Sequence, residues 1–89
     1  PKITRDHNFL LNRKDLVGDF MKKLEKTPLL VNLSVKEVYS GDKIPPQQKC
    51  VTISATYQSN DHTLSEEEIN EAHQKLIDTA LKNGASLRV

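Results

Sequence analysis

Strand-type and helix-type patterns alternate along this chain in one order, and that order constrains the fold more than any other feature. Residues 50–57 alternate apolar and small polar side chains, as a half-buried strand does. Weaker strand signals lie in residues 6–11, 31–39 and 87–89, and two stretches with apolar residues at helical spacing separate them. The order predicts an α+β fold of the ferredoxin-like β-α-β-β-α-β type. In this fold a four-stranded antiparallel sheet carries both helices on one face and leaves the other face open.

The first helix is predicted between Asn12 and Thr27. Asn12 would cap its start, with Asp15 supporting the first turn. Pro28 would end it, because the residue before a proline avoids helical geometry. Its apolar stripe would consist of Leu16, Val17, Phe20, Met21 and Leu24.

The strand over residues 31–39 changes phase near its end. Its first apolar residues occupy every second position, but Val38 is out of phase with them. A β-bulge near Lys36 and Glu37 would account for the slip. Val38 would then face the helices, while Glu37 and Tyr39 face the open side. The apolar residues in phase are Val31, Leu33 and Val35.

The second helix has the clearest start signal in the chain. Ser65 and Glu68 stand at the spacing of a capping box, and Leu64 and Ile69 can form the hydrophobic staple around it. Gly84 would end the helix in a left-handed conformation. Its buried stripe would consist of Ile69, Ala72, Leu76, Ile77, Ala80 and Leu81, with His73 on or beside it as a partly buried, hydrogen-bonded residue.

Composition excludes several classes of function. The chain of 89 residues is 36% apolar and 28% charged, as expected for one globular domain. It has no apolar run near the ~20 residues of a membrane span. The net charge of +1 is lower than usual for a non-specific duplex binder. The single cysteine, Cys50, indicates a reducing compartment. Because no nucleophile–base pair, phosphate loop or zinc pattern is present, we expect no catalytic site in this chain.

Side chains at the end of the second strand are the candidates for a binding site. Tyr39 offers a ring for base stacking, and Glu37 could accept hydrogen bonds from a guanine edge. Cys50 is expected on the outer surface of the neighbouring strand. Each also has a simpler explanation: Tyr39 packs under the proline loop, Glu37 is a solvated acid, and Cys50 is a small surface residue. The candidates for phosphate contacts are Lys43, Lys49 and Arg88.

Three short motifs carry a family resemblance. Glu37-Val38-Tyr39-Ser40-Gly41 closes a strand, and Lys49-Cys50 follows after a proline-containing loop. Thr63-Leu64-Ser65-Glu66-Glu67-Glu68-Ile69 then opens a helix. Their order and spacing resemble the ferredoxin-fold anticodon-binding domain at the C-terminus of the phenylalanine–tRNA ligase β subunit.

The resemblance implies a domain that binds the anticodon loop of phenylalanine tRNA. The parent enzyme would be a cytoplasmic, bacterial-type α2β2 ligase that uses ATP and Mg²⁺ and has its catalytic site on the other subunit. This chain would need no cofactor. Residues 1–89 would form one domain of a longer polypeptide.

By the same resemblance, Tyr39 would be the stacking residue. Glu37 stands where the family has a guanine-reading aspartate, and Cys50 where it has an anticodon-contacting serine. Because Glu37 is longer and the Cys50 thiol is a poorer donor, Tyr39 and Lys49 are the better-supported assignments.

Two alternatives stay open. One is the equivalent domain of the single-chain organellar ligase. The other is a ferredoxin-like regulatory domain that binds a small ligand or dimerises through its sheet. A generic RNA-recognition motif is disfavoured, because the third strand lacks the paired aromatic residues of that motif.

Overall fold

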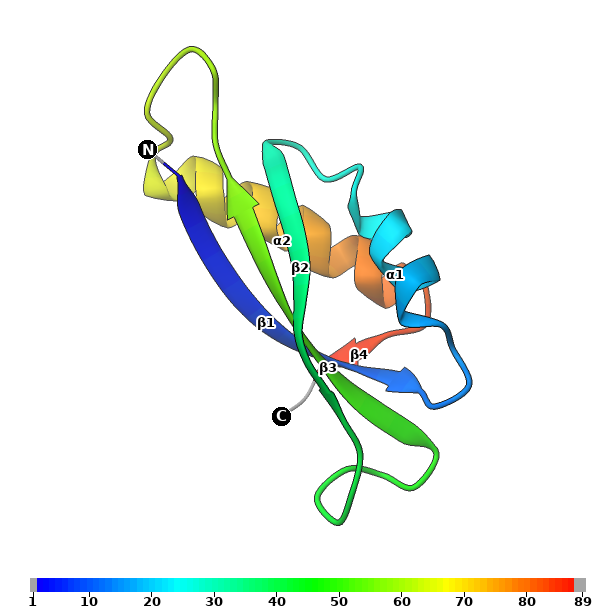
Figure 1. Ribbon diagram of the computed structural model, residues 1–89. Coiled ribbons are helices and arrows are strands. Elements are labelled where there is room, and N and C mark those ends of the chain that lie inside the picture. The colour runs from blue at the N-terminus through cyan, green and yellow to red at the C-terminus, as the bar shows by residue number, and fades with distance from the viewer. Residues whose placement is uncertain (1, 88–89) are drawn as a thin grey trace.

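The predicted order of strands and helices is confirmed in a computed structural model, which describes residues 2–87. The strands form one antiparallel sheet in the order β2-β3-β1-β4, and both helices cover the same face of it (Figure 1). This is the ferredoxin-like arrangement. The elements are β1 (Ile3–Asn12), α1 (Val17–Leu24), β2 (Leu30–Tyr39), β3 (Gln48–Tyr57), α2 (Glu66–Lys82) and β4 (Ser86–Leu87). Residues 88–89 of the predicted last strand lie outside the described residues.

The core lies between the helices and the central strands β1 and β3. These two strands pair over ten positions, from Ile3 opposite Tyr57 to Asn12 opposite Gln48. Every second residue of β3 faces the helices with no exposed surface, as the alternation predicted: Val51, Ile53, Ala55 and Tyr57. Phe9, Phe20, Leu24 and Leu76 fill the space between the sheet and the two helices.

The predicted bulge in β2 is present. The register shifts between Val35 and Glu37, and beyond the shift Val38 pairs with Val51 and Tyr39 with Cys50. Residues directly opposite each other in an antiparallel ladder share a face. Val38 therefore faces the helix side, and Tyr39 faces the opposite side.

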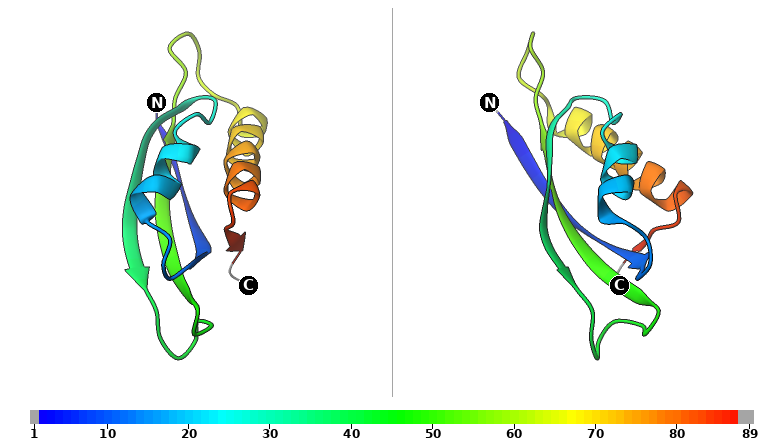
Figure 2. Two further views of the ribbon diagram at one scale, coloured as in Figure 1. Left: turned by 90° about the vertical axis from the view of Figure 1, so that its right-hand side faces the viewer. Right: turned by 45° about the vertical axis from the view of Figure 1, so that its right-hand side comes forward.

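A second register shift, between Leu30 and Asn32, was not predicted. It makes Val31 the extra residue, so Val31 is 52% exposed and does not join Val35 in one apolar row. Val35 and Val38 are also 40% and 46% exposed. The eight residues of α1 extend only about 12 Å, whereas the ten of β2 extend about 33 Å. The helix therefore leaves the far end of this edge strand uncovered (Figure 2).

The predicted bounds of the first helix are wrong. Asn12 is the last residue of β1, and its side-chain oxygen accepts the Lys14 N–H at 3.0 Å, which forms a turn instead of a helix cap. The helix begins at Val17, and Leu16, which was predicted in the apolar stripe, stands instead at the N-cap and is 68% exposed. It ends at Leu24, whose carbonyl accepts the Thr27 hydroxyl at 2.7 Å.

Lys49 holds the turn that replaces the predicted first turn of the helix. It pairs with the buried Leu11, so its side chain lies on the helix side of the sheet. Its Nζ donates to the carbonyl of Arg13 at 3.3 Å and to the carbonyl of Asp15. The ammonium group thus connects β3 to the backbone of residues 13–15.

The predicted start and end of the second helix are confirmed. Glu68 N–H donates to the Ser65 hydroxyl at 3.2 Å, and the Ser65 N–H donates to the Glu68 carboxylate at 3.0 Å. Gly84 ends the segment at φ +93°, a conformation that favours glycine. Of the predicted stripe, Leu81 is the exception, since it is 42% exposed.

Two histidines lie side by side between β1 and α2. The rings of His7 and His73 have centroids 5.4 Å apart, and the Tyr57 hydroxyl lies 2.7 Å from His73 Nδ1. Burial raises the pKa of Tyr57 to about 12, so the phenol keeps its proton and its O–H can donate a hydrogen bond to Nδ1 of a neutral His73. Burial also lowers the pKa of both histidines, and the nearby charges of His7 and Arg5 further lower that of His73. The predicted hydrogen-bonded state of His73 is confirmed.

We expect the free energy of unfolding to fall as the pH is lowered below about 6.5. The folded pKa of His7 and His73 lies below the unfolded value, so the unfolded chain takes up protons first as the pH falls. Urea unfolding at pH 7.5 and 5.5 measures the effect. The loss should be smaller in His7→Leu, which removes one titrating ring and its repulsion of His73.

His62 provides a control of opposite sign. Hydrogen bonds to Glu68 and Asp61 raise its pKa, so its contribution is present below about pH 6.5 and is lost as the pH rises through its folded pKa. His62→Gln should therefore steepen the loss at low pH. If wild type and His7→Leu lose the same stability between pH 7.5 and 5.5, the lowered pKa of His7 does not cause the loss.

We also expect Lys49→Met to destabilise the fold, since it leaves two turn carbonyls without their charged donor. Hydrogen bonds to charged groups contribute about 1.5–3 kcal/mol, and a loss of that size should appear in urea unfolding. Lys22→Met, on the exposed side of α1, is the matched control and should change little. Equal stability of the two variants would show that Lys49 does not hold the turn.

Candidate nucleic-acid interface

The uncovered face of the sheet carries side chains in rows that cross β2, β3 and β1. The register defines these rows, because paired residues share a face. The row nearest the β2–β3 loop consists of Tyr39, Cys50 and Leu10, and the next consists of Glu37, Thr52 and Asn8. The two rows beyond are Ser34, Ser54 and Asp6, and then Asn32, Thr56 and Thr4.

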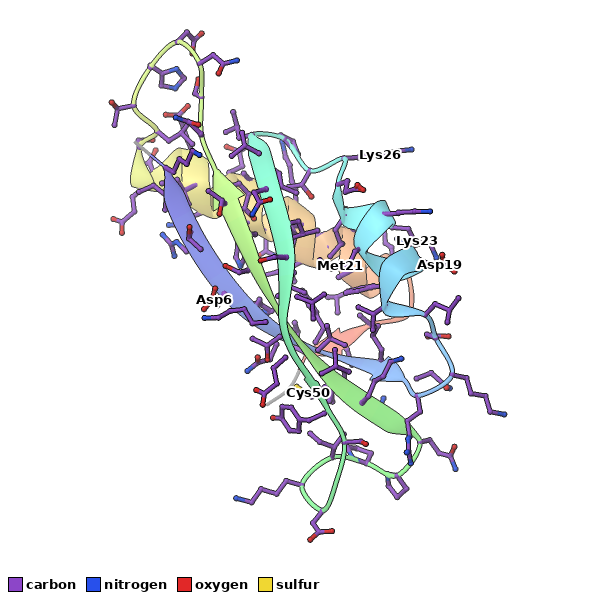
Figure 3. The ribbon with its side chains drawn as sticks, in the orientation of Figure 1. Asp6, Asp19, Met21, Lys23, Lys26 and Cys50 are labelled. Atoms are coloured by element: carbon purple, nitrogen blue, oxygen red, sulfur yellow. The ribbon has the colours of Figure 1, made fainter. Side chains whose placement is uncertain are left out.

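Polar interactions hold these rows in place. The Thr52 hydroxyl donates to Asn8 Oδ1 at 2.6 Å, and the Thr4 and Thr56 hydroxyls lie 3.1 Å apart. At the bulge, Lys36 Nζ donates to Asp6 at 2.9 Å, and this bond lowers the pKa of the Asp6 carboxyl (labelled in Figure 3). This exposed ion pair adds little stability, but it aligns the two side chains on the surface. The result is an ordered polar surface on the helix-free side of the sheet.

Tyr39 and Glu37 lie where the sequence predicted them. Both face the open side of β2, two residues apart, and Glu37 is exposed while Tyr39 is half-buried. The ring of Tyr39 lies at the last position of its strand, next to the β2–β3 loop. A phenol beside an exposed carboxylate can offer stacking and hydrogen-bond acceptance to the same ligand.

The prediction that Cys50 is a surface residue is wrong. Cys50 (labelled in Figure 3) is on the predicted face, but it is 0% exposed. Its cross-strand neighbours in the sheet are Tyr39 and Leu10. Burial raises the pKa of its thiol, and the negative charge of Glu37 raises it further. The thiol therefore stays protonated beneath the surface, where a nucleotide cannot contact it without movement of the side chains above.

The three basic candidates fall in different places. Lys49 lies on the helix side and donates to the β1–α1 turn, so the geometry does not present it to a phosphate on the open face. Lys43 is exposed in the β2–β3 loop. Arg88 lies outside the described residues.

The sequence analysis did not name Asn8, Thr52 or Asp6 as candidate site residues, although they lie on this surface. The alternation of β1 and β3 contained the signal, because each of them is out of phase with the buried residues. What the sequence lacked was the register that places them in rows beside Glu37.

The described part of the chain shows neither a metal cluster nor a membrane span. Among residues 2–87, no group of three or more His, Cys, Asp or Glu side chains could hold a metal ion. Neither helix in that range is long and apolar enough to cross a membrane.

Comparison with known proteins identifies the family. Residues 1–88 match the family described as ferredoxin-fold anticodon binding domain. The phenylalanine–tRNA ligase β subunits of Carboxydothermus hydrogenoformans and Rhodopseudomonas palustris are each 34% identical, over 99% and 97% of this chain. That of Bacillus cereus is 30% identical over 99% of it. The chain spans 11% of the length of each of these relatives. It belongs to the ferredoxin-fold anticodon binding domain family.

Proposed function

We propose that this domain binds the anticodon loop of phenylalanine tRNA through its open sheet face. The observation that carries the proposal is the position of Tyr39, at a strand end on the face that the helices leave uncovered. Family membership supports it, because the family is described by anticodon binding. The matched relatives carry the name of the phenylalanine enzyme.

Tyr39 would stack on one unpaired base of the loop. Sequence-specific recognition of RNA targets single-stranded loops, whose bases can be splayed out onto aromatic side chains. Because Cys50 is buried next to Tyr39, its role would be to support the row from below and not to contact the base. This differs from the role that the family resemblance implied for Cys50.

Glu37 would read the edge of the stacked base. It lies about 6.6 Å along β2 from Tyr39, on the same face, and its carboxylate only accepts hydrogen bonds. A guanine edge offers two neighbouring N–H donors, which suits such a group. In the same row, the Thr52 hydroxyl donates to Asn8 Oδ1. This bond fixes the orientation of the Asn8 amide, whose N–H groups could then donate to the RNA.

The wider assignment follows from the same family relation. We propose that the chain acts within a longer β subunit, in the cytoplasm, with an α subunit as partner in an α2β2 ligase. ATP and Mg²⁺ would act at the catalytic site of that enzyme, which charges phenylalanine tRNA. Arg88 and Lys43 are proposed phosphate contacts. Lys49 is not, because its ammonium group donates to carbonyls of the β1–α1 turn.

We expect Tyr39→Ala to weaken binding of a phenylalanine-tRNA anticodon stem-loop by about 1–3 kcal/mol, the contribution of one stacked base. Titration of the chain with the stem-loop, followed by NMR, measures weak affinities and locates the perturbed residues. Tyr39→Phe keeps the ring and is the matched control. If Tyr39→Ala binds like Tyr39→Phe, the ring is not in the site.

We further expect a stem-loop with changed anticodon bases to bind more weakly than the native one. Glu37→Gln should reduce this difference, because an amide replaces one acceptor with a donor. The measurement compares native and changed loops on both proteins. Equal binding of the two loops by the wild type would favour the alternative, a regulatory domain for a small ligand.

A further inference from the structure

We propose that a hollow at the Tyr39 end of the sheet is a second nucleotide subsite. It would hold the ribose and phosphate of the nucleotide next to the one stacked on Tyr39. This inference rests on the proposed function, since it needs an RNA loop on the open face.

The hollow lies between the β1–α1 turn and the β2–β3 loop. Its volume of about 520 Å³ falls within the range of ligand pockets, about 300–1,000 Å³. Its polar lining comes from Arg13, Ser40, Asp42 and Gln48, and apolar contacts come from Ile44 and the two prolines of the loop.

The hollow continues the proposed site. Ser40 follows Tyr39 directly in the chain. Gln48 is two residues before Cys50 on β3, so the alternation places it on the same open face. An RNA strand with one base on Tyr39 continues either toward the Glu37 row or toward the loop. A strand that continues toward the loop would enter the hollow.

Backbone hydrogen bonds connect the walls of the hollow with no ligand present. Ile44 is buried, and its N–H donates to the Gly41 carbonyl at 3.0 Å. The Gln48 N–H donates to the Pro45 carbonyl at 2.9 Å, and the Arg13 N–H donates to the Gln47 carbonyl at 2.9 Å. Gly41 adopts φ +152°, which side-chain-bearing residues rarely do. A preformed wall lowers the entropy cost of binding.

The lining suits a ribose phosphate more than a bare polyanion. Arg13 Nη1 donates to the Pro46 carbonyl at 3.4 Å, which uses one of the five guanidinium donors and holds the group over the loop. The remaining donors suit a phosphate. Asp42 contributes a carboxylate that can accept the ribose 2′-OH, the group that distinguishes RNA from DNA. Arg13 and Asp42 carry opposite charges, so the hollow as a whole does not attract an anion strongly. A nucleotide would therefore bind through both its phosphate and its ribose.

The first test uses the salt dependence of stem-loop binding by the chain. Arg13→Gln should weaken binding several-fold for every loop sequence and lower the slope of log K against log salt by about 0.7, one phosphate contact. Lys14→Gln removes the same charge one residue away, outside the hollow, and should keep the slope near that of the wild type. Arg13→Lys should retain the slope if the fold is intact. Equal slopes in Arg13→Gln and Lys14→Gln would overturn the phosphate contact.

The second test replaces single loop nucleotides with their 2′-deoxy forms. In the wild type, one position should lose affinity several-fold, and Asp42→Ala should abolish that difference. Asp61→Ala, at an exposed acid of a different loop, should preserve it. A penalty that persists in Asp42→Ala, or no penalty at any position, would overturn the ribose contact.

The two proposals fail in different ways. If Tyr39→Ala weakens binding but the Arg13 and Asp42 variants behave like their controls, the subsite is wrong and the proposed function stands. If Tyr39→Ala has no effect and changed anticodons bind equally well, the proposed function is wrong, and the subsite falls with it.

Discussion

The central strand β3 determines where every other part of this domain lies. It pairs with β1 over ten positions and with β2 on its other side, and four of its residues face the helices with no exposed surface. A slip of one residue would turn Tyr57 and Ile53 outward, so the buried face fixes the register. The same register sets the rows of the open face. Core and candidate site are therefore two sides of one constraint, and the site cannot shift along the sheet without loss of the core.

The bulge in β2 reconciles this register with the edge strand. Without it, the residues after Val35 would continue in their original phase, and Tyr39 would face the helices. The extra residue, Lys36, reverses the phase and places Glu37 and Tyr39 on the open face. Its ammonium group then pairs with Asp6 on that face, across the sheet. A local irregularity thus creates the candidate site, and the alternation of the flanking residues made it predictable from sequence.

Local patterns predicted what local interactions decide. The capping box at Ser65 and the alternation of residues 50–57 needed no distant partner, and both are confirmed. Asn12 shows the opposite case, because asparagine favours helix caps and turns alike. Its pairing with Gln48 across the sheet decides between them, and that contact links residues 36 positions apart. The register shift at Val31 likewise depends on the pairing of β2 with β3, which the sequence alone did not show.

The sequence predicted which face of the sheet carries the candidate site, but not which of the site's side chains are buried. Alternation gives the side of the sheet for Cys50, but it does not show that neighbouring side chains cover the residue completely. The sequence also did not predict that Lys49 holds the β1–α1 turn. Its partners are carbonyls of residues 13 and 15, which were expected in the first helix but precede its observed start at Val17. That turn is also the one that carries Arg13 to the edge of the hollow. Lys49 therefore belongs to the binding surface indirectly: from the helix side, it positions the loop whose next contact would be with RNA.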